Sequence, residues 1–421
     1  MEAIDGITDP WTAGSWILEQ MKDGFYHNGR FFVFNGELYD EVKLEELQLL
    51  IMKLLKEKAT QAKIALIIDR LRYELPKFEG SRKYMAFKDG YIDPDKLTMQ
   101  REKYIHQERI WQLLPFDFDT VAQPVKWYAF LDQIFEGDED HNEKKALLQE
   151  FFGYVFLKDM NLQKALVLYG DGGNGKSIVL DVLAEMVPKV SRLEWGELSD
   201  QRNLERLADS WLNISTEISY KETNATIGFK KAIAMETMTA NPKYKAPFDF
   251  VCSAKFAFAT NGLPMTDDPS SGVFRRLMVL SLNNSFVGKE NWNLINELKE
   301  EIPGIFNWAL IGAMRLKKNK EFTHVPSNMQ ELAEYRRAIN SLQSFYDENL
   351  EMYEGQEIPF QQFYRDYTSY CLETSNRPYA RNKIRSLVKQ LGLELKVYTS
   401  SANIRMVKAL TPINWSNDGS F

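Results

Sequence analysis

Short apolar runs bounded by turn residues alternate with amphipathic stretches in the central part of the chain, residues 161–285. The clearest runs are Ala165–Tyr169, Phe256–Thr260 and Leu277–Leu282, which are too short for helices and apolar on both faces. Strands of this kind are buried on both sides, which is typical of a parallel sheet covered by helices. The alternation of strands with helices therefore predicts an α/β core.

The flanking segments have other patterns. Arg30–Tyr39 contains an Asn-Gly turn typical of a hairpin, Leu44–Lys58 has the apolar spacing of a helix, and Tyr84–Ile92 is expected to form a second hairpin. We therefore predict four domains: an N-terminal α+β accessory domain at 1–115, a helical collar or linker at 116–160, the α/β core at 161–335, and a C-terminal module of helices and a strand pair at 336–421.

Composition narrows the class of protein. The chain has 421 residues, 44% of them hydrophobic and 13% aromatic, which is enough for several packed cores. A net charge of −7 argues against a protein that coats DNA over its whole surface, although it leaves room for a local basic channel. Cys252 and Cys371 are too few for a metal motif or a disulfide framework, and no signal peptide or membrane-spanning stretch stands out. We expect a cytoplasmic protein with no membrane partner.

One glycine-rich segment has the chemistry of a phosphate-binding loop. Between the strand Ala165–Tyr169 and a helical stretch at Ser177–Met186 lies a complete Walker A pattern, made by Gly170, Asp171, Gly172, Gly173, Asn174, Gly175, Lys176 and Ser177. Glycines let backbone N–H groups converge on a phosphate, Lys176 is expected to reach the β and γ phosphates, and Ser177 to hold Mg²⁺. The helix points its positive end at the anion. This context favours ATP and Mg²⁺ binding over a simple glycine-rich turn.

Two more polar residues follow predicted core strands. Glu217 ends the run Trp211–Glu217, where a carboxylate is expected to hold Mg²⁺ and polarise the attacking water, although Thr216 stands where two adjacent acids are usual. Asn261 follows the strand Phe256–Thr260, where an amide can orient that water. The alternative for Asn261 is a plain Asn-Gly turn.

Positive residues flank the last two core strands. Arg275 and Arg276 precede Leu277–Leu282, and an arginine there can stabilise phosphate charge in a neighbouring subunit; the alternative is a surface or structural pair. Lys243, Tyr244 and Lys245 occupy the expected tip of a hairpin. Lysines bind a phosphate backbone and an aromatic side chain stacks on a base, so the tip is a candidate DNA contact, with an exposed loop as the alternative.

The order of these motifs resembles that of the superfamily 3 helicases of the AAA+ class, and most of all the phage, plasmid and poxvirus primase–helicase family. Leu148–Tyr154 ahead of the loop, Lys243–Lys245 leading into Phe256–Pro264, and Arg275–Val279 are the stretches most similar to that family. Weaker similarity covers Phe34–Gly36, Leu113–Phe118, Phe363–Tyr367 and Tyr370-Cys371. Departures are Thr216, and Met235-Glu236 where relatives often have glycine and an acid.

The resemblance implies a hexameric ring that translocates on single-stranded DNA. Lys176, Ser177, Glu217 and Asn261 would act on the nucleotide of their own subunit, Arg275 or Arg276 would act in trans, and Lys243 and Lys245 would line the pore. Residues 1–115 lack a clustered acidic triad of a primase. The chain is therefore expected to be a stand-alone helicase or the helicase part of a longer protein, with a primase or other replication proteins among its partners.

The C-terminal module is rich in Lys and Arg. Asn382–Leu391 has helical spacing, and Leu395–Tyr398 and Ile404–Val407 have the pattern of two strands, an order typical of a winged helix. Such a helix can enter a major groove with the basic face made by Arg381, Arg385 and Lys389. A solvated basic face is the alternative.

Together these patterns predict an α/β, P-loop AAA+ ATPase core with an N-terminal α+β region and a C-terminal winged-helix-like module. The predicted function is that of an ATP-dependent replicative DNA helicase of a phage, plasmid or mobile element, in the cytoplasm of a bacterial host. Two alternatives stay open. One is an origin-binding initiator whose ATPase controls assembly, and the other is an AAA+ ATPase that remodels protein or packages DNA.

Overall fold

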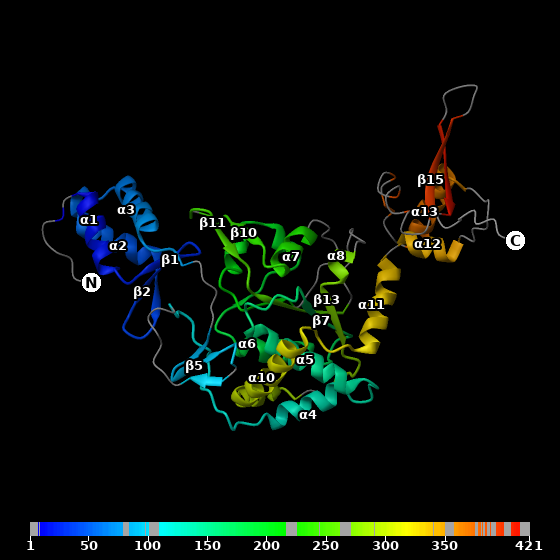
Figure 1. Ribbon diagram of the computed structural model, residues 1–421, viewed down its shortest axis with the longest axis horizontal. Helices are drawn as coiled ribbons and strands as arrows, with labels where there is room; N and C mark the ends of the chain where they lie inside the picture. The colour runs from blue at the N-terminus through cyan, green and yellow to red at the C-terminus, as the bar shows by residue number, and fades with distance from the viewer. Residues whose placement is uncertain are drawn as a thin grey trace. The chain divides into compact units, whose positions relative to one another are not determined.

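The computed structural model contains a five-stranded parallel sheet, to which the strands labelled β7 and β13 in Figure 1 belong. Its strand order is β13-β7-β12-β9-β8. The strands are β7 (Ala165–Tyr169), β8 (Val190–Ser191), β9 (Leu212–Ser215), β12 (Lys255–Thr260) and β13 (Leu277–Ser281). The parallel α/β core predicted from the buried apolar runs is confirmed.

The structure describes residues 7, 9–78, 84–96, 98–100, 109–215, 225–243, 245–261, 271–289, 291–339, 341–349, 358–374, 378–379, 381, 384, 388, 393–399 and 406–412. The chain forms two compact units, Met1–Met329 and Gln330–Phe421. No helix of the described residues is long and apolar enough to cross a membrane. The finer predicted domain boundaries stay predictions.

Helices surround the sheet. They are α4 (Val125–Ile134), α5 (His141–Phe156), α6 (Lys176–Glu185), α7 (Ala225–Ile233), α8 (Ser271–Phe274), α9 (Leu294–Lys299) and α10 (Ile302–Asn319), with short 3-10 helices at Gly196–Ser199 and Leu204–Arg206. The region 116–160, predicted to be helical, contains α4 and α5, and its apolar side chains are buried, among them Trp127 and Leu131 in α4 and Leu148 and Phe152 in α5. These apolar faces form one large core with the strands.

Helices α5 and α10 cross at very short range because each contributes a glycine to the contact. A Cβ added to Gly153 would lie 2.4 Å from the Ala313 nitrogen, and one added to Gly312 would lie 2.2 Å from the Gln149 carbonyl oxygen. Beside this crossing, the fully buried Glu150 accepts hydrogen bonds from Arg315 Nε (2.5 Å) and from the backbone nitrogen of Thr323 (2.7 Å). The two helices are therefore fixed to each other by shape and by a compensated buried charge.

The N-terminal part contains two small sheets and three helices. The first sheet consists of β1 (Phe25–His27), β2 (Arg30–Phe34) and β3 (Tyr39–Val42), and it is accompanied by α1 (Pro10–Gln20), α2 (Leu44–Leu55), a 3-10 turn at Lys56–Lys58 and α3 (Gln61–Glu74). The second sheet consists of β4 (Met85–Phe87), β5 (Gly90–Asp93) and β6 (Thr98–Gln100). Both predicted hairpins and the predicted helix at 44–58 are confirmed.

The two sheets belong to different cores. Met85, Phe87 and Ile92 of the second sheet pack into the large central core, whereas α1, α2 and α3 share a core of their own. In the first hairpin the side chain of Asn35 accepts hydrogen bonds from the backbone nitrogens of Glu37 (2.8 Å) and Leu38 (2.9 Å). This local bonding explains why the Asn-Gly pair turns the chain there.

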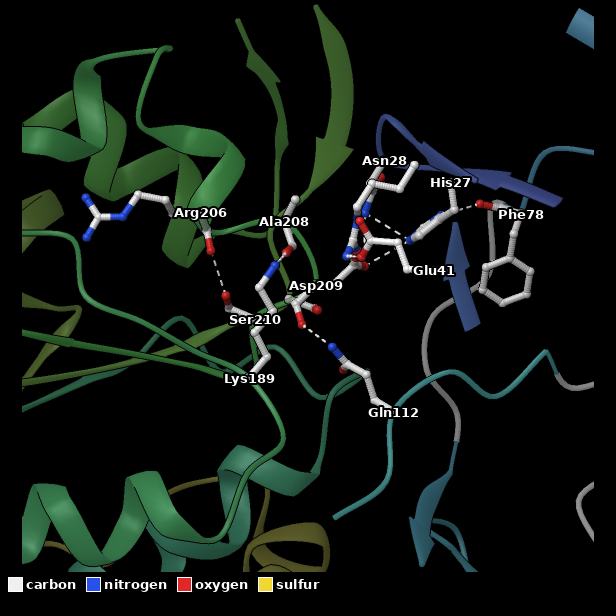
Figure 2. Close-up of polar contacts among 12 residues, drawn as sticks. His27, Asn28, Glu41, Phe78, Gln112, Lys189, Arg206, Ala208, Asp209 and Ser210 are labelled. Carbon is white, nitrogen blue, oxygen red and sulfur yellow. Dashed lines mark hydrogen bonds and ion pairs between the residues drawn. The ribbon is translucent and has the colours of Figure 1, made fainter. Parts of the chain in front are cut away.

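One buried carboxylate joins the first sheet to the central core. Asp209 has φ +60 and lies just before β9, and its side chain is only 4% exposed. It accepts hydrogen bonds from His27 Nε2 (2.9 Å) and Asn28 Nδ2 (3.0 Å), and it pairs with Arg30. Figure 2 shows His27 and Asn28 directed toward Asp209 from the turn between β1 and β2. The turn between β1 and β2 of the first sheet, which we call the accessory sheet, is thereby attached to the core by charge-assisted contacts.

The second unit contains α12 (Ser341–Asn349), α13 (Phe360–Glu373), β14 (Ile358–Pro359), β15 (Leu393–Thr399) and β16 (Met406–Pro412), while α11 (Pro326–Ile339) spans the boundary between the units. The sheet order is β14-β16-β15, and both contacts are antiparallel. The predicted strand pair is present, but its bounds differ. β15 extends beyond the predicted Leu395–Tyr398 at both ends, whereas β16 begins at Met406 and runs past the predicted end at Val407 to Pro412. The predicted helix Asn382–Leu391 lies mostly outside the described residues, so the winged helix is not shown.

Candidate functional site

The glycine-rich loop leaves β7 and enters α6 in conformations that only glycine adopts easily. Gly170, Gly173 and Gly175 have φ values of +149, +73 and +86. A Cβ on Gly170 would lie 2.3 Å from both Asn174 Nδ2 and the Leu282 carbonyl oxygen. Because α6 starts at Lys176, the first backbone N–H groups of the helix open toward the loop. The strand, loop and helix order expected from the sequence is confirmed, and its geometry suits an anion.

Lys176 is 8% exposed and its ammonium is held inside the loop. It donates hydrogen bonds to the carbonyl oxygens of Gly170 (2.6 Å) and Asp171 (2.8 Å) and to Asn174 Oδ1 (2.8 Å). Burial lowers the pKa of Lys176, and the charge of Asp171 opposes that effect. All three donors are aimed at oxygen atoms, so an entering phosphate oxygen has to replace one of them. Ser177, the next residue, is exposed.

Asn174 fastens the loop to the neighbouring strand. Its side chain is buried, its Nδ2 donates to the Leu282 carbonyl oxygen just after β13 (2.8 Å), and its Oδ1 receives the Lys176 ammonium. The segment beyond β13 also closes over the loop, since the Phe286 nitrogen donates to the Gly173 carbonyl oxygen (2.7 Å). The Walker A pattern leaves this position unspecified, so its structural role could not be predicted from the motif.

The carboxyl ends of the central strands meet beside the loop. Thr260 at the end of β12 pairs with Tyr169 at the end of β7, and β9 lies on the other side of β12 with Ser215 opposite Phe258. Asn261 is therefore next to the loop at the edge where the sequence placed it, and it is exposed. Thr216 and Glu217 directly follow Ser215 in the chain and lie outside the described residues.

The arginine pair lies at the amino ends of the strands, opposite the ends that meet beside the loop. The Arg276 carbonyl oxygen accepts a hydrogen bond from the nitrogen of Ala165, the first residue of β7 (2.8 Å). A strand of this length spans about 17 Å, so neither arginine reaches the loop of its own chain. Neither arginine can therefore act on a nucleotide bound to its own chain. A catalytic role is compatible with the fold only if the arginine acts on the nucleotide of a neighbouring subunit.

The two arginines differ in their surroundings. Arg276 is 6% exposed and donates to the Gly272 carbonyl oxygen (2.5 Å) and to Gln163 Oε1 (3.0 Å). Burial, and next the charge of Arg275, lower the pKa of Arg276. Arg275 is exposed, and only its carbonyl oxygen is bonded among the contacts described, by Lys164 Nζ (2.6 Å). Arg276 therefore has the contacts of a structural arginine, which was the alternative to a catalytic role. Arg275 has an exposed side chain that can reach another molecule.

The hairpin predicted between Glu217 and Asn261 is present as β10 (Thr237–Ala240) and β11 (Phe248–Val251). Lys243 and Lys245 lie in the connecting loop, and both are exposed. Lys245 Nζ lies 2.6 Å from Glu205 Oε1. Met235, where the resembled family often has glycine, adopts φ +56 just before the hairpin, which gives a physical reason for glycine at that position.

The remaining predicted DNA contacts are described only in part. Arg381 is exposed, and its guanidinium lies over the rings of Phe360 (5.5 Å) and Tyr364 (5.8 Å). Tyr244, Arg385 and Lys389 lie outside the described residues. In the described part of the chain no group of three or more His, Cys, Asp or Glu side chains is placed to hold a metal ion.

Comparison with known proteins adds the following. A family model described as "Family of unknown function (DUF5906)" matches residues 168–276, the stretch that runs from β7 through the loop and the hairpin to the arginine pair. Comparison with curated proteins gives no match. Among solved structures the chain is similar to "The A form apo structure of NrS-1 C terminal region-CTR", at 14% identity and a TM-score of 0.49, covering 96% of this chain and 99% of that chain. It is also similar to "The apo structure of NrS-1 C terminal region (305-718)", at 13% identity and a TM-score of 0.48, with 96% and 99% covered.

Proposed function

We propose that the chain is an ATP-hydrolysing motor that moves along single-stranded DNA, of the superfamily 3 helicase type. The observation that carries the proposal is the loop between β7 and α6, where three glycines in left-handed or extended positive-φ conformations surround the buried ammonium of Lys176. This arrangement suits the phosphates of a nucleotide. Asn261 at the adjacent strand end supports the same assignment, because an amide there can orient water.

The residues of the loop fit ATP with Mg²⁺. The Ser177 hydroxyl stands at the first turn of α6, next to Lys176, where it can bind the cation together with phosphate oxygens. When bound, Mg²⁺ supplies charge neutralisation for the phosphates. Glu217 is proposed as the base or positioning group for the attacking water, in line with the leaving phosphate. Arg275 of a neighbouring subunit is proposed to stabilise the charge that develops on the phosphates. This role requires a subunit interface, and we propose that the subunits form a homohexameric ring.

The first experiment tests the motor itself. The purified 421-residue chain is assayed for ATP hydrolysis with and without single-stranded DNA, and for separation of a forked duplex. We expect DNA-stimulated hydrolysis and unwinding. Lys176→Ala should lose turnover, because the phosphates lose their point-charge partner, and Glu217→Gln should bind ATP without hydrolysing it. Wild-type hydrolysis by Glu217→Gln would show that the acidic strand end is elsewhere.

The second experiment separates a motor from an origin-binding initiator. Lys243→Ala/Lys245→Ala should weaken single-stranded DNA binding and flatten its salt dependence, because fewer counterions are released, while basal hydrolysis survives. The initiator alternative predicts that Arg381→Ala/Arg385→Ala removes duplex binding and the hairpin variant keeps DNA binding. Lys53→Ala/Lys318→Ala removes the same charge from exposed sites outside the hairpin and is the matched control. Normal unwinding by the hairpin variant would rule out a pore role for these lysines.

A further inference from the structure

The accessory sheet and the β10–β11 hairpin enclose a pocket of about 90 Å³. Tyr26, Arg30, Lys43 and Arg72 contribute from the N-terminal part, and Lys245 and Phe248 from the hairpin. The two sides are in close contact, because a Cβ added to Gly29 (φ +79) would lie 2.8 Å from the Phe248 ring. A pocket of this volume holds several water molecules, so it has room for a polar group such as a phosphate.

Positive side chains outnumber negative ones in the lining. Arg30, Lys43, Arg72 and Lys245 are opposed by Glu41 and Glu45. Arg30 pairs with Glu41 Oε2 (2.9 Å) and with Asp209, so its charge is already compensated. Lys43 is exposed and makes no ion pair with the residues that the structure describes. The other positive side chains of the lining are Lys43, Arg72 and Lys245, of which Arg72 pairs with Asp69 and Lys245 with Glu205, both outside the lining.

Arg72 and Lys245 each have more N–H donors than their one ion pair uses. The guanidinium of Arg72 has five N–H donors, and its NH1 contacts Asp69 Oδ1 (2.6 Å). Its Nε is buried, so a ligand in the pocket would meet the terminal nitrogens of the guanidinium. The pair between Lys245 and Glu205 joins two partly exposed side chains, and such a pair contributes little and is easily exchanged for another anion. The pocket thus offers hydrogen-bond donors to an anion from both of its sides.

We propose that this pocket binds one backbone phosphate of the single DNA strand held by the β10–β11 hairpin, so that the N-terminal part forms a second section of the strand's path. The proposal rests on the proposed function, because it takes the hairpin as a DNA contact. Three observations favour a DNA strand as the source of the phosphate. Lys245 belongs both to the hairpin tip and to the pocket, the volume suits a phosphate group, and Tyr26 and Phe248 supply aromatic surface of the kind on which neighbouring bases stack.

The test uses Lys43→Ala/Arg72→Ala in the full chain, with a fluorescent oligothymidine as the probe. Loss of one phosphate contact should weaken binding about 3- to 10-fold and reduce the slope of log affinity against log salt by about 0.7, the value for single strands. Basal ATP hydrolysis without DNA should stay at the wild-type rate. Lys22→Ala/Lys53→Ala removes equal charge from exposed positions of the same part and should leave the slope unchanged.

Two further variants distinguish the loss of a phosphate contact from a folding defect. Glu45→Gln removes an exposed anion from the lining and should tighten oligothymidine binding about 2-fold, an effect that loss of structure cannot imitate. Lys43→Ala/Arg72→Lys restores one charge and should recover part of the salt slope. An unchanged slope in Lys43→Ala/Arg72→Ala, or a slope lowered equally in the control, would overturn the proposal.

The outcomes also separate this proposal from the proposed function. If Lys243→Ala/Lys245→Ala weakens DNA binding while Lys43→Ala/Arg72→Ala does not, the pocket assignment fails and the motor stands. If the wild-type chain binds no single-stranded DNA, the motor fails first. Titration with a fluorescent ATP analogue and with inorganic phosphate covers the other source of the anion. A change in either affinity in Lys43→Ala/Arg72→Ala, at unchanged DNA binding, would make the pocket a site for free phosphate compounds and overturn the DNA assignment.

Discussion

The ammonium of Lys176 lies 2.8 Å from Oδ1 of Asn174, two residues earlier in the same loop, while the amide nitrogen of Asn174 is bonded to the Leu282 carbonyl oxygen. Asn174 therefore fixes both the lysine and the loop itself. Asn174→Ala should weaken ATP binding about 5- to 30-fold, since two hydrogen bonds of roughly 1 kcal/mol each are lost. Titration with a fluorescent ATP analogue measures this, and Asn296→Ala on α9 is a matched control. Equal affinity in both variants would show that the loop keeps its shape without the amide.

Arg275 and Arg276 should give different kinds of defect. Arg276→Ala removes a buried guanidinium with two hydrogen bonds and should lower the free energy of unfolding by about 2–4 kcal/mol. Arg275→Ala, at an exposed site, should change it by less than about 0.5 kcal/mol. Chemical denaturation of the two variants checks both values, and a large loss in Arg275→Ala would contradict the assignment.

The trans role proposed for Arg275 predicts complementation between inactive subunits. Arg275→Ala and Lys176→Ala should each be inactive alone, and mixing them should restore part of the ATP hydrolysis, because some interfaces then pair an intact loop with an intact arginine. The measurement is hydrolysis across a series of mixing ratios. Absence of recovery at every ratio, for Arg275 and for Arg276 alike, would argue against a shared site.

The crossing of α5 and α10 predicts that Gly153→Ala is destabilising although alanine favours helices. The added methyl group would meet the backbone of Ala309 and Ala313, and overpacking of this kind costs about 1–3 kcal/mol or more, which exceeds the helix-propensity gain of about 1 kcal/mol. Thermal melting should show a lower midpoint. Ile311→Ala on the exposed side of α10 is the control, and it should leave the midpoint nearly unchanged.

Lys255 makes stability depend on pH. It is 3% exposed, donates to the Met160 carbonyl oxygen (2.7 Å), and burial lowers its pKa to about 7. The unfolded chain keeps an ordinary lysine pKa of about 10.4, so between these values the unfolded state binds more protons and stability rises with pH. From pH 7 to 8.5 the free energy of unfolding should increase by about 2 kcal/mol. Lys255→Met should remove this slope in urea titrations, and a slope that persists would place its origin elsewhere.

The sequence predicted those parts of the fold that local patterns determine. The strands β7, β12 and β13 consist of short apolar runs, and the glycines of the loop have the positive φ values that the Walker A pattern requires. The two N-terminal hairpins and the hairpin β10–β11 were also predictable, since turn residues separate their strands.

Long-range contacts were not predictable in the same way. Asp209 follows a short 3-10 segment and has no motif around it, yet it meets His27 from a part of the chain 182 residues away. The burial that separates Arg276 from Arg275 depends on Gln163 and Gly272, which no spacing rule connects to them. The strands β4 and β5 pack against an apolar face of the central core that exists only after the central sheet and its helices have assembled. The local sequence of the two strands does not identify this face.

The junction at Asp209 bears on how the molecule behaves when it is shortened. The carboxylate is covered by His27, Asn28 and Arg30, all of which belong to the N-terminal part. A truncation that removed residues 1–78 would uncover a fixed negative charge on the same segment as Glu205, the partner of Lys245 in the hairpin loop. Such a fragment would keep its glycine-rich loop, but it would repel the nucleic acid strand proposed to lie at the hairpin. Asp209→Asn in the fragment would relieve that repulsion, so weak DNA binding by an isolated core would reflect unmasked charge as well as lost contacts.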